Sequence, residues 1–89
     1  MVLLVRNRVQ DVDRWKRVFD AQAAAGTAAG LTVLHVWRSV DAPDQVFFLL
    51  DVEDRERAEA YMASPEAAAV GVEAGALDGE VHFLDPFPE

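Results

Sequence analysis

The sequence predicts an α+β fold in which the elements follow the order strand, helix, strand, strand, helix, strand. Three observations carry this prediction. Short runs of alternating or continuous apolar residues mark four strands, two longer stretches repeat apolar residues at helical spacing, and turn-forming residues separate them. We expect residues 1–89 to form a single domain, because a chain of 89 residues has room for only one hydrophobic core.

The first strand is expected over residues 2–9. Alternation places Leu3, Val5, Asn7 and Val9 on one face, and Val2, Leu4, Arg6 and Arg8 on the other. The first half of this strand is apolar on both faces, which is typical of a strand that is covered on both sides. We therefore expect it to lie in the middle of the sheet.

The first helix is expected to begin after Asp11 or Asp13, either of which can cap it, and to run to about Ala29. Its apolar stripe consists of Val12, Trp15, Phe19 and Ala23, with Val18 beside it. Gly26 weakens the last turns and Gly30 ends the helix.

Two further strands are expected over residues 31–40 and 46–53, joined by the turn-forming residues 41–45. In the first of them, alternation places Leu31, Val33, His35, Trp37 and Ser39 on one face and Thr32, Leu34, Val36 and Arg38 on the other. The second begins with five apolar residues, 46–50, and is therefore the other candidate for a central strand.

The second helix is expected to begin after Asp54 and to end at Gly75. Its apolar face consists of Ala58, Tyr61, Met62, Ala69 and Val70. Ser64 and Pro65 form a new helix start in the middle, so we expect a break or kink there. The last strand is expected over residues 80–85, and the proline-containing tail 85–89 cannot continue its ladder.

Two interleaved right-handed strand–helix–strand units give a ferredoxin-like sheet. In this βαββαβ arrangement the four-stranded antiparallel sheet has its first and third strands in the middle and both helices on one face. The other face is left bare and apolar, and apolar residues make up 52% of the chain. We expect a second copy to cover that face, so that two sheets form a dimeric α/β barrel.

Sequence motifs agree with this architecture. Residues 5–9 read Val-Arg-x-Arg-Val, residues 11–16 read Asp-x-x-x-Trp-Lys, and residues 58–66 read Ala-x-x-Tyr-Met-x-Ser-Pro-Glu. With the order of elements, they resemble the dimeric α/β-barrel superfamily, and within it the small stand-alone domains of the antibiotic-biosynthesis-monooxygenase type. The superfamily includes cofactor-free monooxygenases, haem-degrading enzymes, polyketide cyclases, muconolactone isomerases and proteins without a known reaction. The resemblance therefore implies the fold and leaves the reaction open.

Composition excludes several functional classes. The net charge of −8 disfavours nucleic acid as a partner, because an acidic surface repels phosphates. The chain has no cysteine, no apolar run long enough to span a membrane and no signal-peptide pattern, so we expect a soluble cytoplasmic protein. His35 and His82 lack a third ligand at metal-binding spacing, and no cofactor-binding motif occurs. We expect neither a metal nor a cofactor.

The candidate catalytic residues are Asn7, His35 and His82. Asn7 lies on an otherwise apolar strand face, where its amide could bind a substrate oxygen or could lie near solvent at the strand end. Either histidine could accept a proton, although a structural role is open for both. The resemblance adds that haem-degrading and quinone-forming branches carry an Asn on the first strand.

Those branches pair that Asn with a Trp on the third strand and, for haem, with a His on the second helix. Here the third strand offers Phe47 and Phe48, and the second helix has no histidine. We therefore do not expect haem chemistry.

The candidate substrate-binding residues are Trp15, Trp37, Arg38 and Tyr61. Trp15 and Tyr61 are expected to face the sheet from the two helices, where they could line a pocket or belong to the core. Trp37 could stack on an aromatic substrate or lie in the dimer interface. Arg38 could bind an enolate or carboxylate, but pairing with Asp41 or Asp44 is the simpler interpretation.

Two classes of function stay open. The first is a cofactor-free enzyme acting on an apolar, oxygenated small molecule by oxygenation, cyclisation or isomerisation; the resemblance favours oxygenation. The second is a non-catalytic dimer that binds a hydrophobic ligand or another protein, or serves only in assembly. A pocket lined by Asn7, Tyr61 and a histidine would favour the enzyme.

Overall fold

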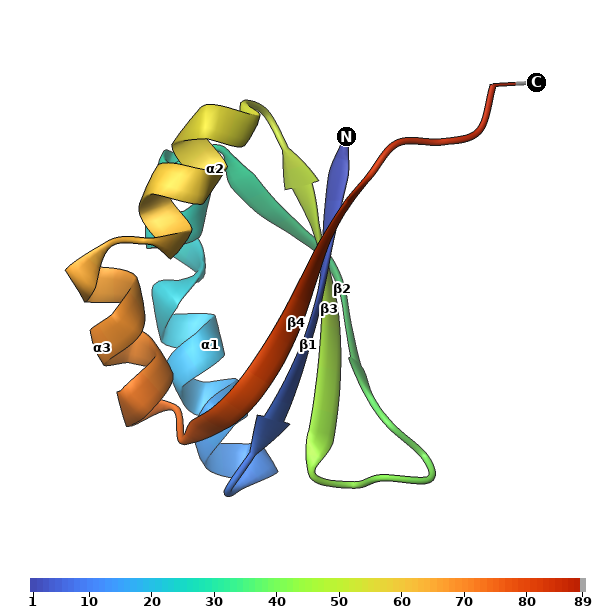
Figure 1. The fold of residues 1–89 in the computed structure, drawn as a ribbon. Helices are drawn as coiled ribbons and strands as arrows, with labels where there is room; N and C mark the ends of the chain where they lie inside the picture. Colours follow the sequence, from blue (N-terminus) through green and yellow to red (C-terminus); the bar gives the residue numbers. More distant parts are fainter. Residues whose placement is uncertain (89) are drawn as a thin grey trace.

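The structure is a computed structural model that describes residues 1–88. Its elements in chain order are β1 (Val2–Val9), α1 (Val12–Ala28), β2 (Leu31–Arg38), β3 (Gln45–Val52), α2 (Arg55–Met62), α3 (Pro65–Glu73) and β4 (Ala76–Leu84). The strands form one antiparallel sheet in the order β2-β3-β1-β4, and the helices cover one face of it (Figure 1). The predicted ferredoxin-like topology, with the first and third strands in the middle, is confirmed.

Local hydrogen bonds explain where the helices begin. Asp11, Asp54 and Ser64 each accept a hydrogen bond from the backbone N–H three residues later, so each satisfies one of the free donors of a first turn. The expected break is confirmed, because α2 ends at Met62 and α3 begins at Pro65.

The core lies between the helices and the sheet. It consists of two clusters of buried side chains: Leu3, Val5, Leu31, Leu50, Val52 and Ala58 in one, and Val9, Trp15, Val46 and Ala74 in the other. All the members from β1 belong to the face that alternation assigned to Leu3 and Val5. Burial of this face supplies the main driving force for packing α1, α2 and α3 on the sheet.

A β-bulge in β2 overturns the predicted faces of that strand. Val33 is paired with Leu50 but His35 is paired with Leu49, so the residue between them is extra. The strand consequently switches faces at Leu34. His35 does not share a face with Val33, as alternation predicted, but lies with Trp37 on the side away from the helices.

The last strand also differs from the prediction. It was expected over residues 80–85, but β4 pairs with β1 from Ala76 to Leu84. The missed residues contain Asp78 and Gly79, which locally favour turns; pairing with β1 overrides that preference. Smaller differences are that β2 ends at Arg38 and that β3 is displaced by one residue, to Gln45–Val52.

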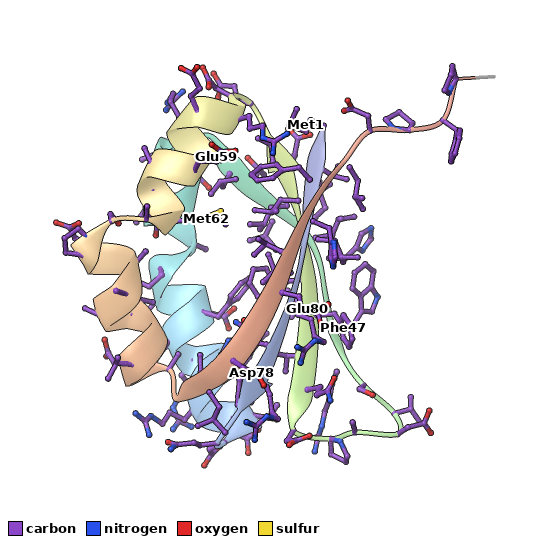
Figure 2. All side chains as sticks on the ribbon, in the orientation of Figure 1. Met1, Phe47, Glu59, Met62, Asp78 and Glu80 are labelled. Carbon is purple, nitrogen blue, oxygen red and sulfur yellow. The ribbon has the colours of Figure 1, made fainter. Side chains whose placement is uncertain are left out.

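We call the side of the sheet away from the helices the outer face. Its residues include Leu4, Arg6 and Arg8 of β1, His35 and Trp37 of β2, Phe47 and Leu49 of β3, and Asp78, Glu80, His82 and Leu84 of β4. No element within residues 1–88 covers this face, and Figure 2 shows Phe47 projecting from it. Within the same residues, no helix has the length and apolar character needed to span a membrane.

Candidate functional site

A cavity of about 330 Å³ lies between the three helices and the sheet. Its walls are mostly apolar: Leu3, Val5, Val33, Phe48 and Leu50 contribute from the sheet, and the helices add aromatic and small side chains. Figure 2 shows Met62 of α2 pointing into the space between helices and sheet, and Met62 lines this cavity. A cavity of this size can hold a small organic molecule.

Three neutral polar side chains line the cavity: Asn7 of β1, Gln22 of α1 and Tyr61 of α2. Among the described residues, none of the three side chains makes a hydrogen bond to protein, and none is sealed from solvent. Apart from the Tyr61 hydroxyl, no ionisable group of residues 1–88 lines the cavity. The site can therefore donate hydrogen bonds to a ligand oxygen but carries no charge to bind a strongly ionic ligand.

An aromatic cluster forms the wall of the cavity beneath α1. Trp15, which is 3% exposed, stacks on Phe19 with ring centroids 4.8 Å apart. Both rings also contact Phe48 of β3, at centroid distances of 5.7 and 4.9 Å. Trp15 was expected either to line a pocket or to belong to the core. It does both, because it is buried in the core and its ring borders the cavity.

Gln22 was not predicted to be a cavity residue, although its spacing along α1 indicates that it faces the sheet. It follows Trp15 by seven residues and Phe19 by three, which places it on the apolar stripe of α1. A polar residue in the middle of such a stripe requires a partner or an opening. Here the opening is the cavity.

The cavity opens between α2 and β4. Val81 lies on the helix-covered face of the sheet, opposite Val5, but it is 48% exposed whereas Val5 is 7% exposed. A more open depression adjoins this opening, and Met62, Val81, His82 and Phe83 are among the residues that line it. The Arg55 guanidinium lies beside it, 4.5 Å from the centre of the Phe83 ring.

Neither histidine reaches the cavity. His35 stacks on Trp37 on the outer face, with ring centroids 5.2 Å apart. His82 lies on the same face, where its Nε2 is 3.4 Å from Glu80 Oε2. The structure therefore brings together Asn7, Trp15 and Tyr61 in the cavity, and places His35 and Trp37 on the far side of the sheet. His82 is also outside the cavity, although it borders the depression beside the opening.

Arg38 lies at the end of β2, outside the cavity. It was expected to pair with Asp41 or Asp44, but its Nε donates instead to the Pro43 carbonyl at 3.2 Å. The hydrogen bond links the end of β2 to the turn between β2 and β3, and so stabilises that turn.

Charged residues form a network on the outer face where β1 meets β4. Arg6 is 3.0 Å from Glu80 and 3.4 Å from Asp78, and Arg8 is 3.2 Å from Asp78. The hydrogen bond from Arg8 lowers the pKa of Asp78, helped by the charge of Arg6. Hydrogen bonds from His82 and then from Arg6 lower the pKa of Glu80.

No cluster of three or more metal-ligating side chains occurs within residues 1–88. His35 and His82 lie on opposite edge strands of the sheet, β2 and β4.

Comparison with protein-family models gives no match to this chain, and comparison with curated proteins gives none either. Solved structures do match. A candidate antibiotic biosynthesis monooxygenase from Bordetella bronchiseptica superposes with a TM-score of 0.80 at 14% identity, covering 98% of this chain and 96% of that one. Another from Caulobacter crescentus gives a TM-score of 0.74 at 19% identity, covering 98% and 89%.

A third match is SnoaB from Streptomyces nogalater, described as a cofactor-independent oxygenase and solved as a mutant. It gives a TM-score of 0.70 at 16% identity, covering 99% of this chain and 96% of that one. The chain has the fold of the antibiotic biosynthesis monooxygenase domains. The fold resemblance predicted from the sequence is confirmed, while identities this low establish the fold alone.

Proposed function

We propose that this protein is a cofactor-independent, monooxygenase-like enzyme that acts on an apolar, oxygenated aromatic molecule of the kind made in secondary metabolism. The observation that carries the proposal is the neutral cavity, where three polar side chains that make no hydrogen bond to residues 1–88 project from apolar walls. The fold shared with SnoaB, a cofactor-independent oxygenase, supports it.

The cavity favours a particular class of substrate. Its volume of about 330 Å³ fits a molecule of two or three fused rings, and its aromatic wall of Trp15, Phe19 and Phe48 suits flat rings. Oxygens on the rings could accept hydrogen bonds from the Asn7 amide, the Gln22 amide and the Tyr61 hydroxyl. A carboxylate or phosphate would find no cation there among residues 1–88.

In the proposed reaction, a substrate such as anthrone, whose acidic CH2 group is conjugated to a carbonyl through the aromatic rings, ionises to its enolate. N–H groups of Asn7 and Gln22 stabilise the enolate oxygen. The enolate passes electrons to O2; one oxygen atom becomes the new carbonyl on the former CH2 carbon, and the other leaves as water with both hydrogens. The substrate supplies all four electrons, so the balance requires no external reductant.

The absence of an imidazole or carboxylate from the cavity lining, among the described residues, bears on the alternatives. A cyclase or isomerase requires a positioned proton acceptor, so this geometry favours it less. Oxygenation of a substrate that ionises readily can release its proton to water at the cavity opening. The second candidate function is binding of the same ligand class without turnover.

We further propose that the protein is a cytoplasmic homodimer formed through the outer face. Trp37 is 47% exposed there and Leu84 is 43% exposed. Apolar exposure of this kind, beside Phe47 and Leu49, favours burial against a second copy.

Oxygen consumption with anthrone as the test substrate examines the proposed function. We expect saturable consumption of one O2 per anthrone converted to anthraquinone. Asn7→Ala should lower kcat/KM by about tenfold to a hundredfold, the loss typical of a hydrogen bond to a charged group. Thr27→Ala, on the exposed side of α1, is the matched control and should have no effect.

The remaining outcomes separate the alternatives. Saturable anthrone binding without oxygen consumption would support the binding function. Loss of activity in His35→Ala, with Asn7→Ala unaffected, would move the site to the outer face. Absence of both binding and turnover would refute the proposal for this substrate class.

A further inference from the structure

Gly79 of β4 lies directly opposite Asn7 of β1 in the sheet. A methyl group on Gly79 would be placed 2.5 Å from Asn7 Oδ1 and 3.0 Å from the Arg6 carbonyl oxygen. The first distance is well inside van der Waals contact, so the Asn7 side chain could not keep its orientation next to any larger residue at position 79.

Backbone conformation does not explain this glycine. Within residues 1–88, the only glycines with a positive φ are Gly30 and Gly75. Gly79 thus occupies an ordinary strand conformation, where glycine weakens a sheet and typically marks the close approach of another group. Two groups approach here, the Arg6 carbonyl at 3.0 Å and, closer, the Asn7 amide at 2.5 Å.

We infer that Gly79 is a positioning residue for Asn7. The Asn7 amide is planar, and with Oδ1 packed over Gly79, the opposite end of the amide is left to face the cavity that Asn7 lines. Gly79 therefore presets the direction in which Asn7 offers a hydrogen bond. Such preorganisation reduces the rotamer entropy lost when a ligand binds.

The role of the amide towards a ligand rests on the proposed function, but the packing of Asn7 on Gly79 does not. The test therefore has two readouts. The first is the pair of side-chain NH2 resonances of Asn7 in a 15N-labelled protein, which needs no ligand. The second is the dissociation constant for anthrone, measured for the wild type, Gly79→Ala, Asn7→Ala and the double variant.

We expect Gly79→Ala to displace the Asn7 NH2 resonances, while Leu77→Ala, an exposed substitution on the same strand, leaves them in place. Gly79→Ala should weaken anthrone binding by the same factor as Asn7→Ala, about 2- to 13-fold for a neutral hydrogen bond. In the Asn7→Ala background, Gly79→Ala should weaken binding no further, because the side chain it displaces is gone.

Unchanged Asn7 resonances in Gly79→Ala would overturn the inference, and so would an equal loss of binding in both backgrounds. If Gly79→Ala alone fails to fold, the double variant should fold, because Asn7→Ala removes the clash with the Asn7 side chain. If the double variant also fails to fold, the clash is with the Arg6 carbonyl and the inference is overturned. If the wild type binds no anthrone, the proposed function fails while the Asn7 resonances still decide the role of Gly79.

Discussion

The chemistry proposed for the cavity depends on three neutral residues from three different elements. Asn7 comes from the sheet, whereas Gln22 and Tyr61 come from α1 and α2. Neutral hydrogen-bond donors can stabilise the negative charge that develops on a substrate oxygen. Their effect is strongest in a site of low dielectric constant that excludes water. The cavity is therefore better suited to steadying a substrate anion than to removing a proton from a weak acid.

Gly71 allows the cavity to extend under α3. It lies inside that helix, where glycine costs about 0.5–1 kcal/mol relative to alanine. Apart from its chain neighbours and the backbone of its own helix, no heavy atom lies within 4 Å of the position that its Cβ would take. Neither a positive φ nor a close contact requires a glycine here. What its absent side chain leaves is open space at the edge of the cavity.

We predict that Gly71→Ala raises the free energy of unfolding by about 0.5–1 kcal/mol in urea denaturation. Gly71→Leu should fill the cavity and weaken anthrone binding. The matched control is Ala68→Gly on the exposed side of α3, which should lower stability by a similar amount and leave binding unchanged. Undiminished binding by Gly71→Leu would show that the ligand does not reach α3.

At the level of elements, the interruption between α2 and α3 explains why the cavity has an opening. Ser64 Oγ donates to the Tyr61 carbonyl at 2.6 Å and accepts from the Ala67 N–H at 3.1 Å, so one hydroxyl ends α2 and begins α3. Pro65 at the first position of α3 prevents the two from forming one straight helix. The edge strand β4 is left only partly covered, as the exposure of Val81 shows.

The charge network between β1 and β4 predicts an acid-dependent loss of stability. The pKa values of Asp78 and Glu80 are lowered in the folded state from ordinary values of 3.8 and 4.5. Their contribution is thus present above those ordinary values and is lost as pH falls through the lowered ones. Both carboxyls are exposed, so added salt should weaken the effect.

Urea unfolding between about pH 5 and pH 3 checks this prediction. The free energy of unfolding should fall with pH less steeply in Asp78→Asn than in the wild type, because the substituted residue cannot titrate. Asp41→Asn, in the exposed turn between β2 and β3, is the charge-matched control. Equal slopes for Asp78→Asn and the wild type would show that the network does not contribute.

On the scale of the whole molecule, the sheet has one face covered by helices and one face without cover (Figure 1). The outer face combines an apolar centre with the charge network along β1 and β4. A four-stranded sheet gains stability when both faces are buried, so a second copy packed on this face would complete the molecule.

We predict that the wild-type protein sediments with twice the chain mass at micromolar concentration. Trp37→Asp should shift it to the monomer, because a carboxylate would be buried in the interface without a partner. Val72→Asp is the control: it introduces the same charge at another exposed apolar residue, on α3, and should leave the dimer intact. Sedimentation of the wild-type protein as a monomer at this concentration would refute the proposed dimeric barrel.

Features that depend on neighbouring residues could be predicted from the sequence. The bounds of β1, a capping aspartate for α1 at position 11 or 13, and the break at Ser64 and Pro65 follow from local hydrogen bonding and backbone conformation. The structure decides that the cap is Asp11. The strand order followed as well, since residues that are apolar on both strand faces identify the central strands. Asn7 and Tyr61 could be proposed as cavity residues because their elements and faces were correctly predicted.

Features that depend on pairing between distant segments could not be predicted. The bulge at Leu34 depends on the register of β2 against β3, and it moves His35 and Trp37 to the outer face. The early start of β4 depends on hydrogen bonds to β1 that override a local turn preference.

The sequence by itself determined the order of the elements, the helix boundaries and the face of β1 that forms the core, because each is set by interactions within a few residues. Only the tertiary structure decided that the histidines lie outside the cavity, that Gln22 lies within it and that Gly79 supports Asn7. These three outcomes depend on strand register and on the approach of helices to the sheet, which are settled only when residues far apart in the chain pack together.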